Sequence, residues 1–318
     1  MSFTPLLGQP AAQTVLERAI TSGRVHHAYR FVGPAGVGKR TAASLMAQAL
    51  VCETPTPFAC GSCSACRRAV TLASEAPRVP RHPDVVFVGR GIYPPALLGK
   101  SEAVGISVEQ IRRIVLPRVG MPPHEARSLV FIVHAADELT SGAANALLKT
   151  LEEPRPGVHF ILLSDRPAKM LDTILSRTLA VRFGPLPEDV LQTLLEKEGL
   201  DPGLASLSQG SLEKARLLSE PEARSAREQF IDAMDGAIAS GKVSEALRFA
   251  DLRPDDRHQL VDALTYTATA YAARARDGHE IRKWAGLHKE ILDAIVEVER
   301  NGSPALVLES LVCRMFNY

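Results

Sequence analysis

A glycine-rich run at residues 33–39, Gly-Pro-Ala-Gly-Val-Gly-Lys, has the composition and spacing of a phosphate-binding loop. It follows a β-rich segment and precedes a helical pattern. Glycines let the backbone N–H groups face a phosphate, the N-terminus of the following helix adds positive charge, and the lysine contacts the β- and γ-phosphates. We predict a nucleotide or phosphate site, with a turn that binds nothing as the alternative. The candidate residues are Gly33, Gly36, Gly38, Lys39 and Thr41.

The groups that hold magnesium beside such a loop are missing from this sequence. The motif needs Ser or Thr directly after the lysine, but Arg40 stands there and Thr41 comes one position late, about 100° further round the helix. The site also needs an apolar strand that ends in Asp-Glu, whereas the strand expected at residues 129–133 ends in His134 and Ala135. Imidazole is a poor ligand for Mg²⁺, and alanine offers none. We therefore expect ATP hydrolysis by this chain to be absent or very weak.

Asp137 and Glu138 follow the same strand after a short interval. We expect them to be solvated charges that precede the next helix. The alternative, that they replace the missing Asp-Glu pair, stays open at this point.

Four of the five cysteines are clustered in sequence. Two Cys-x₂-Cys spacings share Cys63, and Cys52 lies upstream of Cys60 across a seven-residue gap. Four thiolates suit closed tetrahedral zinc coordination, which leaves no position for water and is therefore structural. We predict a structural Zn²⁺, with four reduced thiols in a loop as the alternative. The predicted ligands are Cys52, Cys60, Cys63 and Cys66. Cys313, among apolar residues near the C-terminus, is expected to be a buried free thiol.

Composition and charge narrow the functional class. The 318 residues include 37 Lys and Arg against 36 Asp and Glu, which gives a formal net charge of +1. This balance disfavours a protein that binds DNA on its own through phosphate contacts. The sequence contains no run of about 18 apolar residues, and its first residues lack a basic segment followed by an apolar one. We expect a cytoplasmic protein with reduced thiols, no membrane contact and two or three domains.

Short β-rich runs alternate with helical patterns as far as about residue 183, which is typical of a parallel sheet covered by helices. The expected strands are Tyr29–Val32, Val85–Val88, Leu129–Val133, His159–Leu163 and Ala180–Phe183. The expected helices are Ala11–Thr21, Arg40–Val51, Val108–Leu116, Gly142–Glu152 and Leu171–Ser176. Ser107 and Gln110 fit a capping box, and residues 89–105 are expected to form a surface loop. We predict a doubly wound α/β domain over residues 1–183.

The pattern changes at residues 184–187, Gly-Pro-Leu-Pro, where the β-rich runs stop and apolar residues recur at helical spacing. Breaks in the helical pattern fall at Gly199–Gly203, Gly210, Pro221, Gly241, Pro254, Gly278 and Gly302. We predict a small helical domain at residues 184–221 and a second helical domain at residues 222–318.

Together these motifs resemble the AAA+ subunits of the bacterial replicative clamp loader, the DNA polymerase III clamp-loader family. The resemblance includes the phosphate loop, the cysteine cluster and residues 143–154, AANALLKTLEEP. Further matching motifs are His26-His27-Ala28-Tyr29, His82-Pro83-Asp84, Ile106 to Ile111 (ISVEQI) and Ile174-Leu175-Ser176-Arg177. The resemblance covers about residues 5–220. It implies an α/β AAA+ domain of the P-loop NTPase fold with an inserted zinc module at about 52–66, a helical lid at 184–221 and an all-α oligomerisation collar at 222–318.

The resemblance distinguishes two kinds of subunit. Motor subunits (γ/τ) hydrolyse ATP, whereas δ′ subunits keep the AAA+ fold with a degraded nucleotide site. Arg40, His134 and Ala135 favour the δ′ kind. In the lid, motor subunits carry a Gly-Ser-Leu-Arg-Asp-Ala run whose arginine contacts nucleotide; here Glu213 takes that position, and an acidic side chain repels a triphosphate. The motor subunit remains the alternative.

Arg177 matches the arginine of a Ser-Arg-Cys motif in these subunits, with Thr178 in place of the cysteine. The resemblance implies that Arg177 acts in trans as an arginine finger at the ATP site of a neighbouring subunit. A guanidinium is always charged and offers several donors, which suits it to stabilise a transferring phosphoryl group. An arginine that merely caps a helix end is the alternative.

The resemblance also implies partners and cofactors. The partners are the γ/τ motor subunits and δ in a circular assembly, which opens the β sliding clamp and places it on primer-template DNA. The cofactors are structural Zn²⁺ and, at the degenerate loop, ATP, ADP or phosphate. A free-standing DNA-binding or helicase-type AAA+ protein and a scaffold without a working arginine are the competing interpretations.

Overall fold

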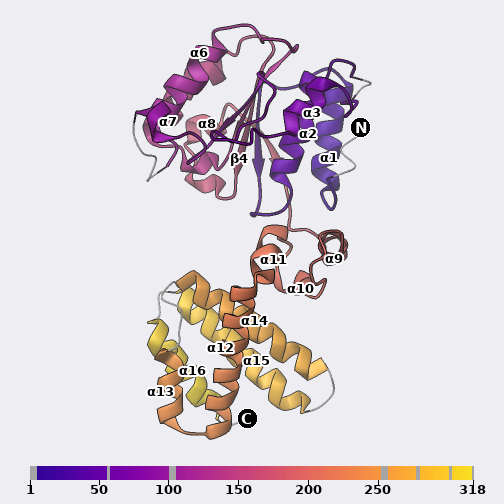
Figure 1. Ribbon diagram of the computed structural model, residues 1–318. Helices are drawn as coiled ribbons and strands as arrows, with labels where there is room; N and C mark the ends of the chain where they lie inside the picture. Colours follow the sequence, from indigo (N-terminus) through magenta and orange to yellow (C-terminus); the bar gives the residue numbers. More distant parts are fainter. Residues whose placement is uncertain are drawn as a thin grey trace. The chain divides into compact units, whose positions relative to one another are not determined.

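The computed structural model of this chain describes residues 6–55, 58–99, 105–251, 257–276, 280–300 and 303–316. The chain divides into two compact units, residues 1–190 and 191–318 (Figure 1). Each unit has its own buried apolar core. The finer division into a domain, a lid and a collar, with boundaries at residues 183 and 221, stays a proposal.

The first unit is built on a five-stranded parallel sheet with the strand order β2-β3-β4-β1-β5. The strands are β1 (Ala28–Val32), β2 (Val85–Val88), β3 (Leu129–Val133), β4 (Val158–Ser164) and β5 (Leu179–Arg182). Each expected strand is present, with its ends shifted by no more than one residue. The inner strands are nearly continuous apolar runs because helices cover both of their faces. The predicted parallel α/β architecture is confirmed.

Helices pack in two layers, one on each face of the sheet (Figure 1). Alternate residues of β3 point to opposite layers: Val130 and Ile132 join the core formed with α1, α2 and α3, while Phe131 and Val133 join the core formed with η1, α7 and α8. The helices of this unit are α1 (Pro10–Thr21), α2 (Lys39–Val51), α3 (Ser64–Val70), α4 (Pro95–Leu98), α5 (Val108–Gln110), α6 (Leu116–Val119), α7 (Ser141–Glu152) and α8 (Asp172–Leu175). Three further turns are the π-helical η1 (Ile111–Val115) and the 3₁₀ segments η2 (Ala136–Glu138) and η3 (Pro167–Lys169).

The expected helices are found, with differences at short segments. The helix expected at residues 108–116 consists of α5, η1 and α6. The Ser107 half of its predicted capping box is present, because Ser107 Oγ accepts the N–H of Gln110 at 3.3 Å, while Oε1 of Gln110 accepts the N–H of Gly89 at 2.8 Å. Two short helices, α3 and α4, were not expected, since four to seven residues are too few to show a helical period. Helix α4 lies in the expected loop 89–105, of which residues 100–104 lie outside the described part of the chain.

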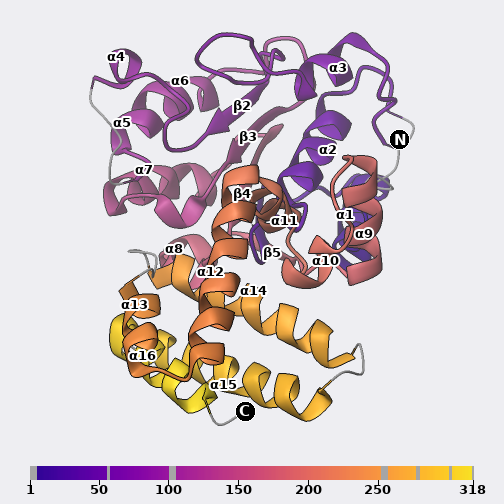
Figure 2. The same ribbon diagram turned by 60° about the horizontal axis from the view of Figure 1, so that its bottom comes forward.

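After β5, the described residues form helices and the connections between them. The helices are α9 (Glu188–Lys197), α10 (Leu204–Leu207), α11 (Leu212–Ser219), α12 (Pro221–Ser240), α13 (Val243–Asp251), α14 (Arg257–Arg276), α15 (Ile281–Glu299) and α16 (Pro304–Met315). Helices α14 and α15 lie side by side (Figure 2). The expected breaks before Pro221 and at Gly241 are found, whereas Pro254, Gly278 and Gly302 lie outside the described residues.

Two further expectations concern the described helices. Cys313 is half-buried at the edge of the second unit's core, so the prediction of a buried thiol is wrong, although the thiol is free. None of the helices in the described ranges is long and apolar enough to span a bilayer.

Candidate functional site

The glycine-rich loop connects the carboxyl end of β1 to α2, as predicted. Gly33 has φ +153°, and a Cβ at this position would lie 2.1 Å from the carbonyl oxygen of Phe183. Gly36 and Gly38 have φ +70° and +98°, in the region that side chains disfavour. Glycine is therefore required by close approach at the first position and by backbone conformation at the other two.

Lys39, the first residue of α2, is buried and its ammonium group contacts three protein oxygens. Its Nζ lies 2.6 Å from Oδ1 of Asp165 and donates to the carbonyl oxygen of Gly33 at 2.8 Å. It also donates to the carbonyl oxygen of Pro34. An ammonium group has three N–H donors, so these three oxygens match its full capacity. Sequence reasoning missed Asp165, which directly follows β4, the strand beside β1.

The two residues at the positions of the missing magnesium ligands lie near one aromatic ring. The Cζ of Arg40 is 5.5 Å from the ring centroid of Phe87, and the ring of His134 is 4.6 Å from the same centroid. Burial, and then the charge of Arg40, lowers the pKa of His134 to about 4, so this imidazole is neutral at pH 7. Thr41 is exposed. A guanidinium, a ring and a neutral imidazole do not fit Mg²⁺, which needs oxygen ligands.

Asp137 is not a solvated charge, contrary to the prediction, whereas Glu138 is partly exposed. The side chain of Asp137 is 3% exposed and its Oδ2 lies 3.3 Å from Nε of Arg166. Glu138 pairs with Arg90 at 3.0 Å. The difference arises because η2, which contains both acids, packs beside η3 and so brings Arg166 to Asp137. The order of the strands decides this contact, and local sequence does not show it.

Arg177 follows α8 and is held at its surface by nearby acceptors. Its Nη2 lies 2.5 Å from Oε1 of Glu152, at the carboxyl end of α7. Its Nη1 donates to the carbonyl oxygen of Thr173 and to Oγ of Ser176, each at 3.0 Å. The bond to Thr173 is the helix-end contact that the simpler alternative expects. One third of the Arg177 side chain is nevertheless exposed, so the side chain is accessible to another molecule.

Arg177 and Lys39 lie at opposite edges of the sheet. Strands β1 and β5 are parallel, with Tyr29 opposite Leu179 and Val32 opposite Arg182. The phosphate loop follows Val32 at the carboxyl edge, whereas Arg177 precedes Leu179 at the amino edge. The paired residues alone span about 10 Å of strand. Arg177 therefore does not reach the phosphate loop of its own chain.

Arg177 lines a cavity with a volume of about 650 Å³. The same cavity is lined by two histidines, His26 and His27, and by Glu152. The two imidazole rings stack with their centroids 4.2 Å apart. Burial, followed by the neighbouring His26, lowers the pKa of His27. In the sequence, the two histidines and Glu152 belong to motifs that match the family. Sequence analysis assigned them no role, because the strand order that brings them close to Arg177 was not known.

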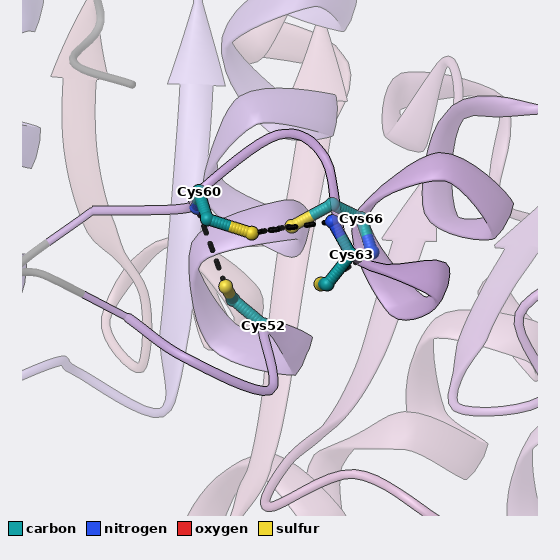
Figure 3. A group of neighbouring side chains, drawn as sticks. All are labelled: Cys52, Cys60, Cys63 and Cys66. Carbon is teal, nitrogen blue, oxygen red and sulfur yellow. Dashed lines mark hydrogen bonds between the residues drawn. The ribbon is translucent and has the colours of Figure 1, made fainter.

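The four clustered cysteines converge on one point, as predicted (Figure 3). Their Sγ atoms all lie within 4.8 Å of one another. Tetrahedral zinc with Zn–S distances of about 2.3 Å requires sulfur atoms about 3.8 Å apart, so a small contraction of the group would suffice. Residues 56 and 57, between the first two cysteines, lie outside the described residues. The four residues Cys52, Cys60, Cys63 and Cys66 can hold a metal ion, and sulfur donors favour zinc.

Backbone N–H groups point at the sulfur atoms of this cluster. Cys63 donates its N–H to Cys60 Sγ at 3.3 Å, and Cys66 donates its N–H to Cys63 Sγ at 3.4 Å at the start of α3. The N–H of Cys63, followed by that of Ser62, lowers the pKa of the Cys60 thiol to about 5. Burial raises the pKa of Cys66. At Cys60 the N–H donors therefore favour the thiolate, the form in which cysteine binds metal.

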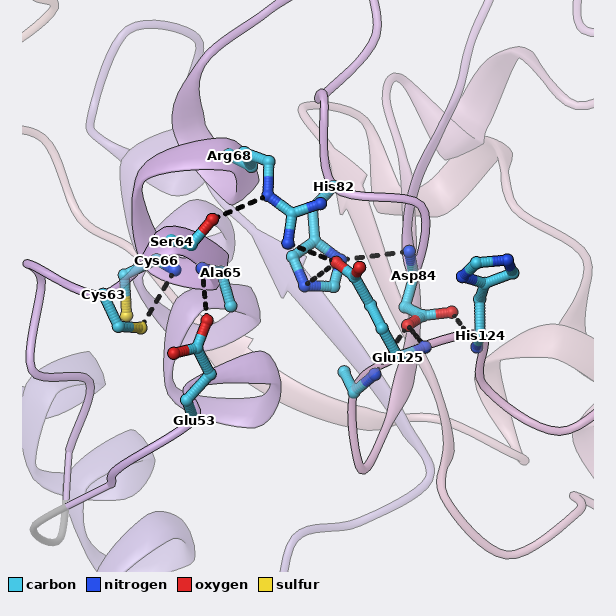
Figure 4. Close-up of polar contacts among 11 residues, drawn as sticks. Glu53, Cys63, Ser64, Ala65, Cys66, Arg68, His82, Asp84, His124 and Glu125 are labelled. Carbon is cyan, nitrogen blue, oxygen red and sulfur yellow. Dashed lines mark hydrogen bonds and ion pairs between the residues drawn. The ribbon is translucent and has the colours of Figure 1, made fainter.

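A polar network joins the cysteine cluster to the sheet (Figure 4). Arg68, on α3, lies 2.5 Å from Oε1 of Glu125, and Nε2 of His82 lies 3.3 Å from the same oxygen. Asp84, just before β2, accepts the backbone N–H groups of residues 124, 125 and 126 at 2.6, 2.9 and 2.8 Å. The network fixes α3 and the 124–126 turn to the start of β2. Such anchoring fits a metal that stabilises structure.

Comparison with known proteins identifies the family. A family model described as "DNA polymerase III, delta subunit" matches residues 8–187, more than half of the chain. The chain belongs to this DNA polymerase III clamp-loader family. The matched residues include the phosphate loop, the cysteine cluster and Arg177, and the clamp-loader resemblance predicted from the sequence is confirmed.

Curated relatives of this clamp-loader chain are of two kinds. DNA polymerase III subunit delta′ of Bacillus subtilis is 31% identical over 201 residues, which cover 63% of this chain and 54% of that protein. DNA polymerase III subunit gamma/tau of Mycobacterium tuberculosis is 35% identical over 204 residues (63% and 32%). Subunit tau of Escherichia coli is 32% identical over 274 residues (83% and 38%). The chain spans between about a third and about half of the length of these relatives, and their identities do not separate the two kinds.

Proposed function

We propose that this chain is a δ′-type, non-motor subunit of a DNA polymerase III clamp loader. Within the loader it supplies Arg177 to the ATP site of a neighbouring motor subunit. The loader as a whole would open a β sliding clamp and place it on primed DNA, as the family resemblance implies.

The observation that carries this proposal is the opposition of Arg177 and Lys39 across the sheet. Arg177 precedes β5 at the amino edge, and the phosphate loop follows β1 at the carboxyl edge. An accessible arginine that does not reach its own phosphate loop can contact only a nucleotide bound by another molecule. A guanidinium supplied from a second chain stabilises the charge of a transferring phosphoryl group.

The chain's own loop supports the non-motor assignment. Arg40 and His134 stand at the magnesium positions, and neither side chain is an oxygen ligand. Without a metal ion, the charge that develops during phosphoryl transfer is not offset. Glu213, at the start of α11, adds an exposed acid at the position where motor subunits carry an arginine.

The remaining parts receive matching roles in the proposal. The module at residues 52–66 would hold a structural Zn²⁺ through its four cysteines. The helical segment at residues 184–221 would be the lid and that at residues 222–318 the collar, which holds the γ/τ and δ subunits. The partners beyond these, the β clamp and primer-template DNA, would be reached through the assembled loader.

Reconstitution tests this function. Candidate γ/τ, δ and β proteins are combined with and without this chain, and clamp loading on primed DNA is measured. We expect loading to require the chain, while the chain alone shows no ATP turnover above background. A motor-like rate from the isolated chain that disappears in Lys39→Ala would instead identify an ATP-hydrolysing γ/τ-type subunit. Tight DNA binding by the chain alone, with a steep salt dependence, would indicate a free-standing DNA-binding protein.

A further inference from the structure

The ammonium group of Lys39 has no free donor for a phosphate. Its Nζ contacts Asp165 Oδ1 at 2.6 Å and the carbonyl oxygen of Gly33 at 2.8 Å, and it also donates to the carbonyl oxygen of Pro34. Its side chain is 7% exposed. Since an ammonium group has three donors, a phosphate can bind Lys39 only by displacing one of these oxygens.

The strand register explains why a carboxylate reaches this position. Strands β1 and β4 are neighbours, and Val32 at the end of β1 is paired with Ser164 at the end of β4. The N–H of Gly33 donates to the carbonyl oxygen of Ser164 at 3.3 Å. Asp165, the next residue after β4, therefore enters the loop at the level of Gly33. Arg166 follows it and pairs with Asp137 at 3.3 Å.

We propose that Asp165 takes the place of a bound phosphate in this loop, so that the chain neutralises Lys39 internally and excludes nucleoside polyphosphates. The proposal concerns the isolated chain and does not depend on the role of Arg177.

Charge decides the competition between Asp165 and a nucleotide. A di- or triphosphate in the loop would bring several negative charges next to the Asp165 carboxylate, and like charges at contact distance repel strongly. In a working site, a magnesium ion offsets such charge. Here Arg40 lies over Phe87 and His134 is neutral, so a metal ion that could compensate for the carboxylate lacks its ligands.

The exposure of the two side chains shows which of them can be substituted without disturbing the fold. Asp165 is half-exposed, with 49% of its side chain accessible, whereas Lys39 is enclosed by the loop. The carboxylate is therefore the component that can be removed without emptying the core. Removal of its charge would return one donor of Lys39 to the loop.

Calorimetric titration of the full-length chain with ADP, ATP and inorganic phosphate, each with and without Mg²⁺, tests the proposal. We expect wild-type affinity to be weaker than millimolar for each probe. Asp165→Asn and Asp165→Ser should each bind ADP at least tenfold more tightly, and adding Lys39→Met should abolish the gain. Asp172→Asn, which makes the same change in net charge at an exposed position of α8, should leave the affinity as in wild type.

Micromolar binding of ADP or ATP by the wild-type chain overturns the proposal, whatever the variants do. The proposal is also overturned if an Asp165 variant that melts cooperatively binds ADP no more tightly than wild type. The same holds if the gain in ADP affinity persists when Lys39→Met is added, or if Asp172→Asn gives an equal gain. None of these measurements uses the assembled loader. A failure here is therefore distinct from a failure of reconstitution, which tests the proposed function.

Discussion

Glu152, the last residue of α7, and Arg177, the second residue after α8, form an ion pair in which Oε1 and Nη2 lie 2.5 Å apart. In the proposed assembly Arg177 must exchange this carboxylate for phosphoryl oxygens. The pair is partly exposed and is therefore a modest barrier to that exchange.

Glu152→Gln should ease the exchange. An exposed pair contributes up to about 1 kcal/mol, so we expect the chain to bind an ATP-loaded motor subunit about twofold to fivefold more tightly. Surface-immobilised binding measurements at fixed salt would show it. Glu153→Gln, one residue further along the same helix end, is the matched control. Weaker binding by Glu152→Gln would mean that the carboxylate positions Arg177 and does not restrain it.

Arg177→Ala should lower ATP turnover by the reconstituted loader while the chain stays folded. Arginine fingers contribute about 10³-fold or more at the site they serve, so the loss should be confined to the ATP site that borders this chain. Single-turnover hydrolysis measures the effect, and circular dichroism checks the fold. Arg112→Ala, which removes another surface arginine of the same unit, is the control. Unchanged turnover in Arg177→Ala would leave this arginine with its helix-end bond to Thr173 as its role.

Zinc should be present at about one ion per chain in protein purified without chelator, because four thiolates form a closed site. Cys63→Ser should lose the metal and lower the melting temperature by about 10 °C, which corresponds to about 3 kcal/mol for a unit of this size. Metal analysis and calorimetric melting are the measurements. Cys313→Ser should retain the metal, since this thiol lies in the other unit. Wild-type protein that contains no metal, together with a Cys63→Ser variant that melts at the wild-type temperature, would refute the site.

His134 should make the chain less stable as the pH falls from about 6.5 towards 4. Its folded-state pKa of about 4 lies below the ordinary value of 6.5. Between these two values His134 is protonated in the unfolded chain and neutral in the folded chain, so lowering the pH stabilises the unfolded chain. The effect is about 3 kcal/mol at most. Urea unfolding of wild type and His134→Leu across this range should show the variant gaining relative stability as the pH falls. Parallel pH profiles of the two proteins would contradict the shift.

Asp84→Asn should destabilise the first unit by about 2 kcal/mol at pH 7, because an amide offers one acceptor oxygen where the carboxylate accepts three N–H bonds. Burial raises the pKa of Asp84, but the three backbone donors outweigh it and hold the pKa below its ordinary value. The carboxylate's contribution is therefore complete above the ordinary value of 3.8 and is lost as the pH falls below it. Unfolding measured at pH 7 and pH 3 should show the difference between the two proteins shrink in acid. If the difference in the free energy of unfolding between the two proteins were the same at pH 7 and pH 3, the destabilisation would come from packing and not from the charge of Asp84.

Short-range pattern determined much of this protein. The five strands are apolar runs because they are buried on both faces, and that periodicity is visible in the sequence. The phosphate loop depends on consecutive residues, and so does the cysteine cluster apart from Cys52. The spacing of these residues therefore predicted two separate sites: the loop that contains Gly33 and Lys39, and the cluster of four thiols. Arg40 and His134 were recognised as departures because the motif fixes which residue should stand at each position.

Tertiary structure decided the contacts that cross between strands. Sequence pattern does not contain the order β2-β3-β4-β1-β5. That order brings Asp165 to Lys39, and it sets Arg177 and Lys39 at opposite edges. The solvated charge expected at Asp137 was wrong for the same reason, since Arg166 arrives from the end of another strand. Local propensity is a property of neighbours along the chain, whereas a charge is neutralised by its neighbour in space.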